Sequence, residues 1–131
     1  MAVTINSSVT FAIPGGVVPA TVSPIAGDLQ VNIAATIPGT TTNQELDLTL
    51  TLTTLQSIFL VADGALTLKT NSTSAPGDTL TFAANMPLCW VLGMPFPTSS
   101  ATPFSTNVTK FYLTNAGSTT VHLYGQALVQ Q

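Results

Sequence analysis

Residues 45–70 read ELDLTLTLTTLQSIFLVADGALTLKT, and this stretch decides the fold class. From Glu45 to Thr53, leucines alternate with polar residues, which gives a period of two with one apolar face and one polar face. A helix would need apolar residues three and four positions apart, and this run does not supply them. Leu55–Ala62 is almost wholly apolar, as expected of a strand that is covered on both faces.

The dipeptide Asp63-Gly64 follows this apolar run, and Leu66 and Leu68 then resume the alternation. Asp and Gly accept the backbone angles of a tight reversal with little strain, so we predict a hairpin turn here. The stretch therefore predicts two or three consecutive central strands around which the other segments pack.

The rest of the chain continues this pattern of short alternating runs between turn residues. The further predicted strands are 3–13 with a break at 6–8, 29–37, 80–82, 86–92, 108–114 and 121–129. The predicted connections are 40–43, 71–78, a hairpin loop at 115–118, and two Pro-rich segments, 14–27 and 93–104. Because proline cannot donate to a strand ladder, 14–27 is expected to be an extended loop or at best an edge segment.

About eight short strands at close spacing predict an all-β fold, an antiparallel β-sandwich or jelly-roll-like domain with Pro-rich loops and no significant helix. The length of 131 residues fits one domain spanning 1–131. Within it, residues 1–44 hold the N-terminal strands and a Pro-rich segment that could act as a contact arm. The expected core contains Leu48, Leu50, Leu52, Ile58, Leu60, Leu66, Leu68, Phe82, Trp90, Leu113 and Leu123.

Charge is unusually sparse in this chain. Charged residues make up 5% of it, against about 25% in a typical soluble domain, and the net charge is −3. With two basic residues, both lysines, the chain lacks the basic patch that binding to a nucleic-acid backbone requires. A surface with so few charges gives the protein little electrostatic protection against association with other chains. This favours a protein whose surface is covered by other subunits.

Cys89 is the one cysteine, which excludes an intramolecular disulfide and any zinc site built on several cysteines. The N-terminus does not resemble a signal peptide, and no apolar run approaches the roughly 20 residues of a membrane helix. We therefore expect synthesis in a reducing compartment, the host cytoplasm, and no membrane partner. The glycosylation sequons at Asn6, Asn71 and Asn107 are then chance products of a Ser- and Thr-rich sequence.

Few residues in the chain are suited to catalysis, and the pattern predicts no enzyme and no cofactor. His122 and Cys89 would need to be brought together by the fold and oriented by a third group, so an ordinary strand histidine and a small buried thiol are favoured. Glu45 and Asp47 lie two apart on one strand face and could hold a cation, although a solvated face is preferred. No metal site is predicted.

Aromatic residues offer a further alternative, a platform on which a sugar could stack. The candidates are Trp90, Phe96, Phe104, Phe111, Tyr112 and Tyr124. Aromatic side chains in a small β domain more often belong to the core, so the core interpretation is preferred.

From Leu60 onward the chain resembles a family of small all-β structural proteins of tailed bacteriophages. The residues that carry the likeness are Leu60–Asp63, Leu66–Pro76, Met86–Trp90, Pro103-Phe104, Val108-Thr109 and Tyr112–Asn115. They form a strand-and-turn pattern over roughly the second half of the chain. The first half has no such counterpart.

The resemblance implies a virion component without enzymatic activity, most simply a capsid decoration (cement) protein that binds and stabilises the shell. Its partner would be the major capsid protein or another virion protein, its location the capsid surface, and its state a homotrimer by analogy. The alternatives are a head–tail or tail-associated protein, and a carbohydrate- or receptor-binding β-sandwich. Candidate contacts with subunits or capsid are Val17, Val18, Val22, Ile25, Phe96 and Phe104.

Overall fold

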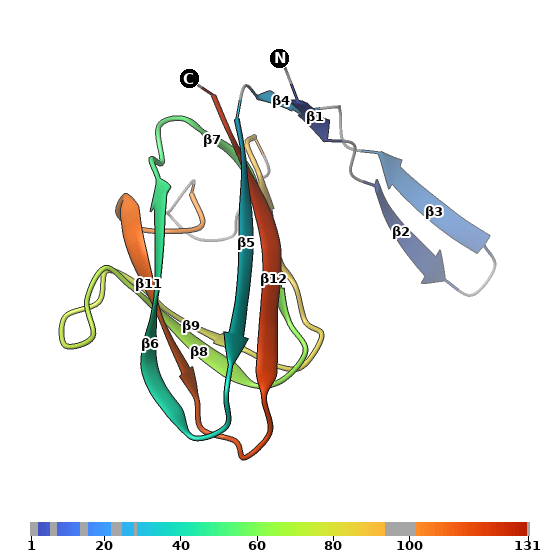
Figure 1. Ribbon diagram of the computed structural model, residues 1–131. Coiled ribbons are helices and arrows are strands. Elements are labelled where there is room, and N and C mark those ends of the chain that lie inside the picture. Colours follow the sequence, from blue (N-terminus) through green and yellow to red (C-terminus); the bar gives the residue numbers. More distant parts are fainter. Residues whose placement is uncertain are drawn as a thin grey trace.

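The structure, a computed structural model, describes residues 29–93 and 102–130 in full. Before residue 29 it describes the backbone of four short strands, β1 (Val3–Ile5), β2 (Ser8–Ile13), β3 (Gly16–Thr21) and β4 (Ile25–Gly27). The regular elements of these parts are all strands, and none of the described residues forms a helix able to cross a membrane. The fold is therefore all-β, as predicted (Figure 1).

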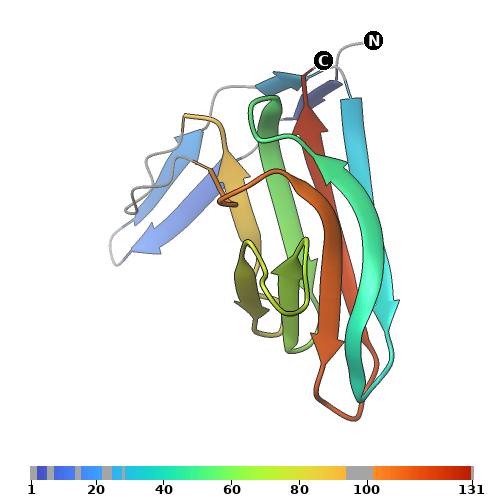
Figure 2. The same ribbon diagram turned by 90° about the vertical axis from the view of Figure 1, so that its left-hand side faces the viewer.

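Two four-stranded antiparallel sheets pack face to face as a β-sandwich (Figures 1 and 2). The β7/β12 sheet has the order β10-β7-β12-β5, with β5 (Leu29–Ile37), β7 (Leu55–Ala62), β10 (Leu88–Val91) and β12 (Val121–Val129). The β8/β11 sheet has the order β6-β11-β8-β9, with β6 (Thr41–Leu50), β8 (Leu66–Thr70), β9 (Thr79–Phe82) and β11 (Val108–Asn115).

The core lies between the sheets and is built from the inward residues of alternating strands. Most of the predicted core residues are buried there: Leu50, Ile58, Leu60, Leu66, Leu68, Phe82, Trp90, Leu113 and Leu123. Leu48 and Leu52 are partly buried and pack against this cluster. Leu48 lies on β6, an edge strand, and Leu52 lies in the turn that follows it. Gly125 belongs to the inner face of β12, where a Cβ would overlap the side chain of Leu60, so only glycine fits.

Residues 45–70 form consecutive strands, as predicted, but the hairpin turn predicted at Asp63-Gly64 is wrong. β6, β7 and β8 alternate between the two sheets, so Asp63-Gly64 carries the chain across the sandwich and is not a hairpin turn. Neither residue adopts a positive φ. The same correction applies to 115–118, which joins β11 of one sheet to β12 of the other. Alternation in the sequence shows which face of a strand is apolar. The apolar face is the same whether the next strand in the chain pairs with this strand or lies in the opposite sheet, so alternation does not predict pairing.

Asn115 stabilises the end of the sandwich at which the 38–40 turn and the 116–120 loop lie together. Its side chain is buried, with 1% exposed. Nδ2 donates to the carbonyl oxygens of Ile37, Pro38 and Thr119 at 3.1, 3.1 and 2.7 Å. Oδ1 accepts from the amide of Gly117 at 3.0 Å. One amide side chain therefore joins two crossovers between the sheets.

The N-terminal strands form two ribbons outside the sandwich, β1 with β4 and β2 with β3 (Figure 1). The segment 14–27, expected to be an extended loop or at best an edge segment, contains the two strands β3 and β4. Pro19 lies in β3 opposite Thr10, and both strands of a two-stranded ribbon are edges, so the edge alternative holds for β3. β5 and the beginning of β6 belong to the sandwich. Only the strands before Leu29 stand outside it, so a contact arm would be shorter than residues 1–44.

Candidate functional site

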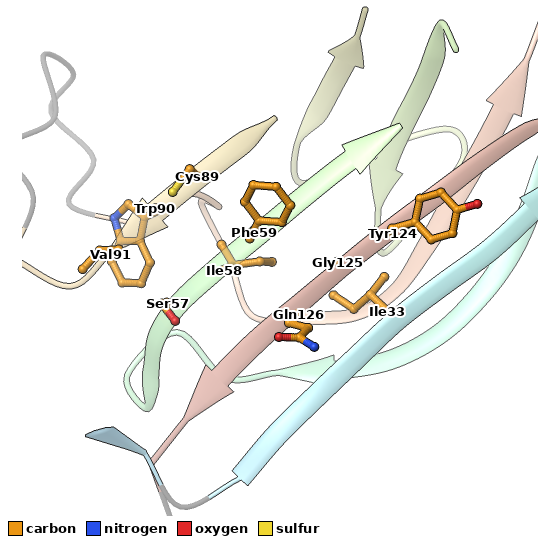
Figure 3. Close-up of a pocket in the computed structure, with 10 residues that line it drawn as sticks. All are labelled: Ile33, Ser57, Ile58, Phe59, Cys89, Trp90, Val91, Tyr124, Gly125 and Gln126. Atoms are coloured by element: carbon orange, nitrogen blue, oxygen red, sulfur yellow. The ribbon is translucent and has the colours of Figure 1, made fainter. Parts of the chain in front are cut away.

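An apolar groove of about 520 Å³ lies on the outer face of the β7/β12 sheet. Figure 3 shows the residues that line it. They are Ile33, Ser57, Ile58, Phe59, Cys89, Trp90, Val91, Tyr124, Gly125 and Gln126, and none of them carries a charge. We call this feature the Phe59/Tyr124 groove.

Strand register explains why large side chains gather on this outer face. Phe59 pairs with Cys89 of β10 on one side and with Gln126 of β12 on the other, so these three residues form one outward row. Tyr124 lies two residues before Gln126 and therefore points to the same face. Phe59 is 45% exposed and Tyr124 is 50% exposed, which is unusual for two neighbouring aromatic side chains.

One end of the same outer face is already covered. Leu128 and Val91 are buried, yet they are not part of the core between the sheets. They pair along the outward row of Ser57, next to the row of Phe59. β4 contacts β7 and β12, the two central strands of this sheet. The Phe59/Tyr124 groove therefore lies beside a buried part of the same outer face.

Beyond the other end of the groove, His122 is held by the carboxylate of Asp63. Its backbone amide donates to Asp63 Oδ1 at 2.7 Å, and its ring Nδ1 lies 2.7 Å from Oδ2. Two hydrogen bonds hold the pKa of Asp63 below its ordinary value. The bond from the backbone amide of His122 has the larger effect, and the bond with the imidazole ring has the smaller one. The imidazole stacks on Tyr124, with ring centroids 5.9 Å apart. Asp63, assigned to a turn by the sequence, instead ties the end of β7 to β12.

Cys89 and His122 are not brought together. Cys89 shares its row with Gln126, which is four residues beyond His122 on β12, about 13 Å along a strand at about 3.3 Å per residue. That separation is far beyond the reach of a proton transfer between thiol and imidazole. The expectation of a buried thiol is wrong, because Cys89 lies on the outer face of an edge strand and is exposed.

Glu45 and Asp47 share a cation that belongs to the chain itself. The ammonium of Lys110 lies 2.7 Å from Glu45 Oε2 and 3.3 Å from Asp47 Oδ1. The hydrogen bonds to Glu45 and then to Asp47 raise the pKa of Lys110. Within the described residues, no group of three or more His, Cys, Asp or Glu side chains could hold a metal ion. The pair is therefore a cross-strand contact between β6 and β11.

The alternative of an aromatic platform does not form as a unit, and the preferred core interpretation is confirmed for three of its residues. Trp90, Phe104 and Phe111 are buried, and the last two pack with ring centroids 5.9 Å apart. Tyr112 is half-buried on the other sheet, which leaves Tyr124 as the exposed candidate. Its neighbour Phe59 was missed, because the continuous apolar run 55–62 suggested a strand covered on both faces and does not show which residues face outward.

The candidate contact residues fall into three groups. Val17 and Val18 lie on β3 and Ile25 lies on β4, both outside the sandwich. Val22 and Phe96 lie outside the described residues. Phe104 was expected to be a contact residue, and this is wrong, since it is 1% exposed and belongs to the core.

No protein-family model matches the sequence, and no curated protein is similar to it. Among solved structures, the chain is similar to one titled Schizosaccharomyces pombe Cnp3 Cupin Domain, with a TM-score of 0.42 and 11% identity. The match covers 97% of this chain and 84% of that chain. At this TM-score the likeness says nothing about function.

Proposed function

We propose that this protein is a non-enzymatic structural component of a tailed-bacteriophage virion, a capsid decoration protein that binds the outer shell and stabilises it. The major capsid protein or another virion protein is its partner, and the protein associates with itself, as a trimer by analogy. It is made in the host cytoplasm and ends on the capsid surface.

The observation that carries this proposal is the pairing of a nearly uncharged chain with a partly covered apolar outer sheet face. The bacteriophage likeness is a separate support, and its residues occupy β7, β8, β10 and β11, which are strands of both sheets. A neutral surface of Thr, Ser and apolar residues loses little hydration of charges when it is buried against another protein.

The stabilising mechanism is mass action. A protein that binds the assembled shell but not its dissociated subunits stabilises the shell, by about 2.7 kcal/mol per site at a free concentration one hundred times Kd. Catalysis is not required, and the exposed thiol and the imidazole do not need to act together.

Particle composition and position test the proposal. A density map of the intact particle, with quantification of this chain in purified virions, should place many copies over the shell. Few copies at the neck or tail would overturn the decoration role in favour of the head–tail or tail-associated alternative. Particles carrying Cys89→Ser or His122→Ala should decorate normally, and loss of binding by a folded variant of either kind would contradict a role without chemistry.

A carbohydrate- or receptor-binding role is the second candidate, and the exposed rings of Phe59 and Tyr124 favour it. A sugar site also needs hydrogen-bonding groups beside the rings. Gln126 is the one amide among the described residues that line the groove. Binding of an oligosaccharide by the wild-type chain, abolished by Tyr124→Ala but not by Tyr112→Ala, would favour this candidate over decoration.

A further inference from the structure

We propose that the Phe59/Tyr124 groove receives the β2–β3 hairpin of a second copy of this chain. This inference specifies the surface used in the proposed self-association, and it applies to the purified protein whether or not a capsid is its partner.

The hairpin needs a surface to cover it. Figure 1 shows β2 and β3 projecting away from the sandwich. A two-stranded hairpin alone is at best marginally stable in water, so one that persists normally packs on something else.

The register of the hairpin creates one apolar face. Phe11 pairs with Val18, and Val9 pairs with Ala20. Paired residues of a ladder share a face, and alternate residues along a strand return to it. Ile13 therefore joins these four residues on one face. No residue from Ser8 to Thr21 carries a charge.

The groove matches this face in chemistry and position. Its described lining is also uncharged, so neither surface loses the hydration of a charge on contact. The hairpin lies between β1 and β4 in the chain, and β4 contacts β7 and β12, two of the strands that carry the groove.

The geometry favours a second copy over the chain's own hairpin. The links between the hairpin and the β1–β4 ribbon are residues 6–7 and 22–24, and the ribbon is held against β7 and β12. Figure 1 shows β2 and β3 standing apart from their own sandwich, so within this chain they do not fill the groove. Exchange of identical elements around a closed ring of copies fills every groove without a different partner.

Cys89 allows a direct test, because it lies in the groove and is the one cysteine of the chain. Wild-type chain is mixed with a Cys89→Ser/Ala20→Cys variant and oxidised with glutathione disulfide. Position 20 shares the register of Val9, within the apolar set of the hairpin. A disulfide requires Cα atoms within about 7 Å, so it reports a close approach. The matched control, Cys89→Ser/Ala12→Cys, places the cysteine at a position of the alternate register.

The proposal predicts a mixed disulfide dimer with Ala20→Cys at several times the yield obtained with Ala12→Cys. Equal yields, or no mixed dimer from either variant, would overturn it. A single chain carrying both Cys89 and Ala20→Cys distinguishes the remaining case. If it closes on itself as a monomer, at a yield independent of concentration, its own hairpin fills the groove and the second copy is excluded.

Sedimentation supplies an independent readout. Tyr124→Gln should weaken self-association at least tenfold, whereas Tyr112→Gln, a matched change on the other sheet, should leave it within twofold. A wild-type chain that sediments as a monomer at micromolar concentration overturns the inference. Decoration of particles would still be tested by the density map, so the two proposals can fail separately.

Discussion

Replacing Asn115 with alanine should destabilise the sandwich more than any other single polar substitution among the described residues. The variant removes the donor to the buried carbonyl of Ile37 and the partners of Thr119 and Gly117. Leaving the buried carbonyl unpaired costs about 1–3 kcal/mol, and each of the two part-buried bonds contributes about 0.5–1.5 kcal/mol. The expected loss in the free energy of unfolding is therefore about 2–6 kcal/mol.

Urea denaturation followed by tryptophan fluorescence measures this loss, since Trp90 is buried in the core and is the one tryptophan of the chain. The dependence of the free energy of unfolding on urea concentration should stay unchanged, while the midpoint falls by about 1–3 M at a slope of about 2 kcal/mol/M. Asn32→Ala is the matched control, because Asn32 is exposed on β5 and accepts one bond, from Gln30. Its effect should stay within about 0.5 kcal/mol. A loss below about 1 kcal/mol for Asn115→Ala would refute the view that this side chain joins the two crossovers.

Three further changes test the packing and the electrostatics. Leu50→Ala should cost about 2–5 kcal/mol in a urea melt, because Leu50 is fully buried, and the partly buried Leu48 should cost less on the same change; the reverse order would contradict the register of β6. Gly125→Ala should cost about 1–3 kcal/mol in the same melt, because the new methyl group meets the backbone of β7, and an unchanged midpoint would show that the strands can separate without cost. Asp63→Asn should lower the Tm at neutral pH. The hydrogen bonds from His122 lower the pKa of Asp63 in the folded state. The ionised carboxylate therefore stabilises the fold fully at pH values above its ordinary pKa of 3.8. This contribution is lost as the pH falls through the lower pKa of the folded state. The Tm gap between wild type and variant should therefore close in strong acid, and a gap that stays constant from about pH 7 to about pH 2 would exclude this carboxylate as its cause.

Much of the secondary structure follows from the sequence, because alternation is a local property. Leu29–Ile37 is a strand with the predicted bounds, and the strands around 108–114 and 121–129 differ by a residue or less. The prediction of an all-β sandwich without a helix rests on the same signal and holds for the described residues. Much of the core also follows from the sequence. Strands with alternating apolar and polar residues point their apolar residues inward, and these include the leucines that the pattern identified.

The tertiary structure alone decided which strands pair and which side chains of the apolar runs are exposed. Whether β8 joins β7 or lies opposite it depends on how the whole chain buries its apolar faces, and a local turn signal at Asp63-Gly64 cannot report that. Phe59 is exposed within an apolar run because its strand is covered on one face along part of its length. The groove arises where three strands align Phe59, Cys89 and Gln126 in one row, and those residues are far apart in the sequence. Such a row depends on long-range register, which is set by the packing of both sheets and not by any segment alone.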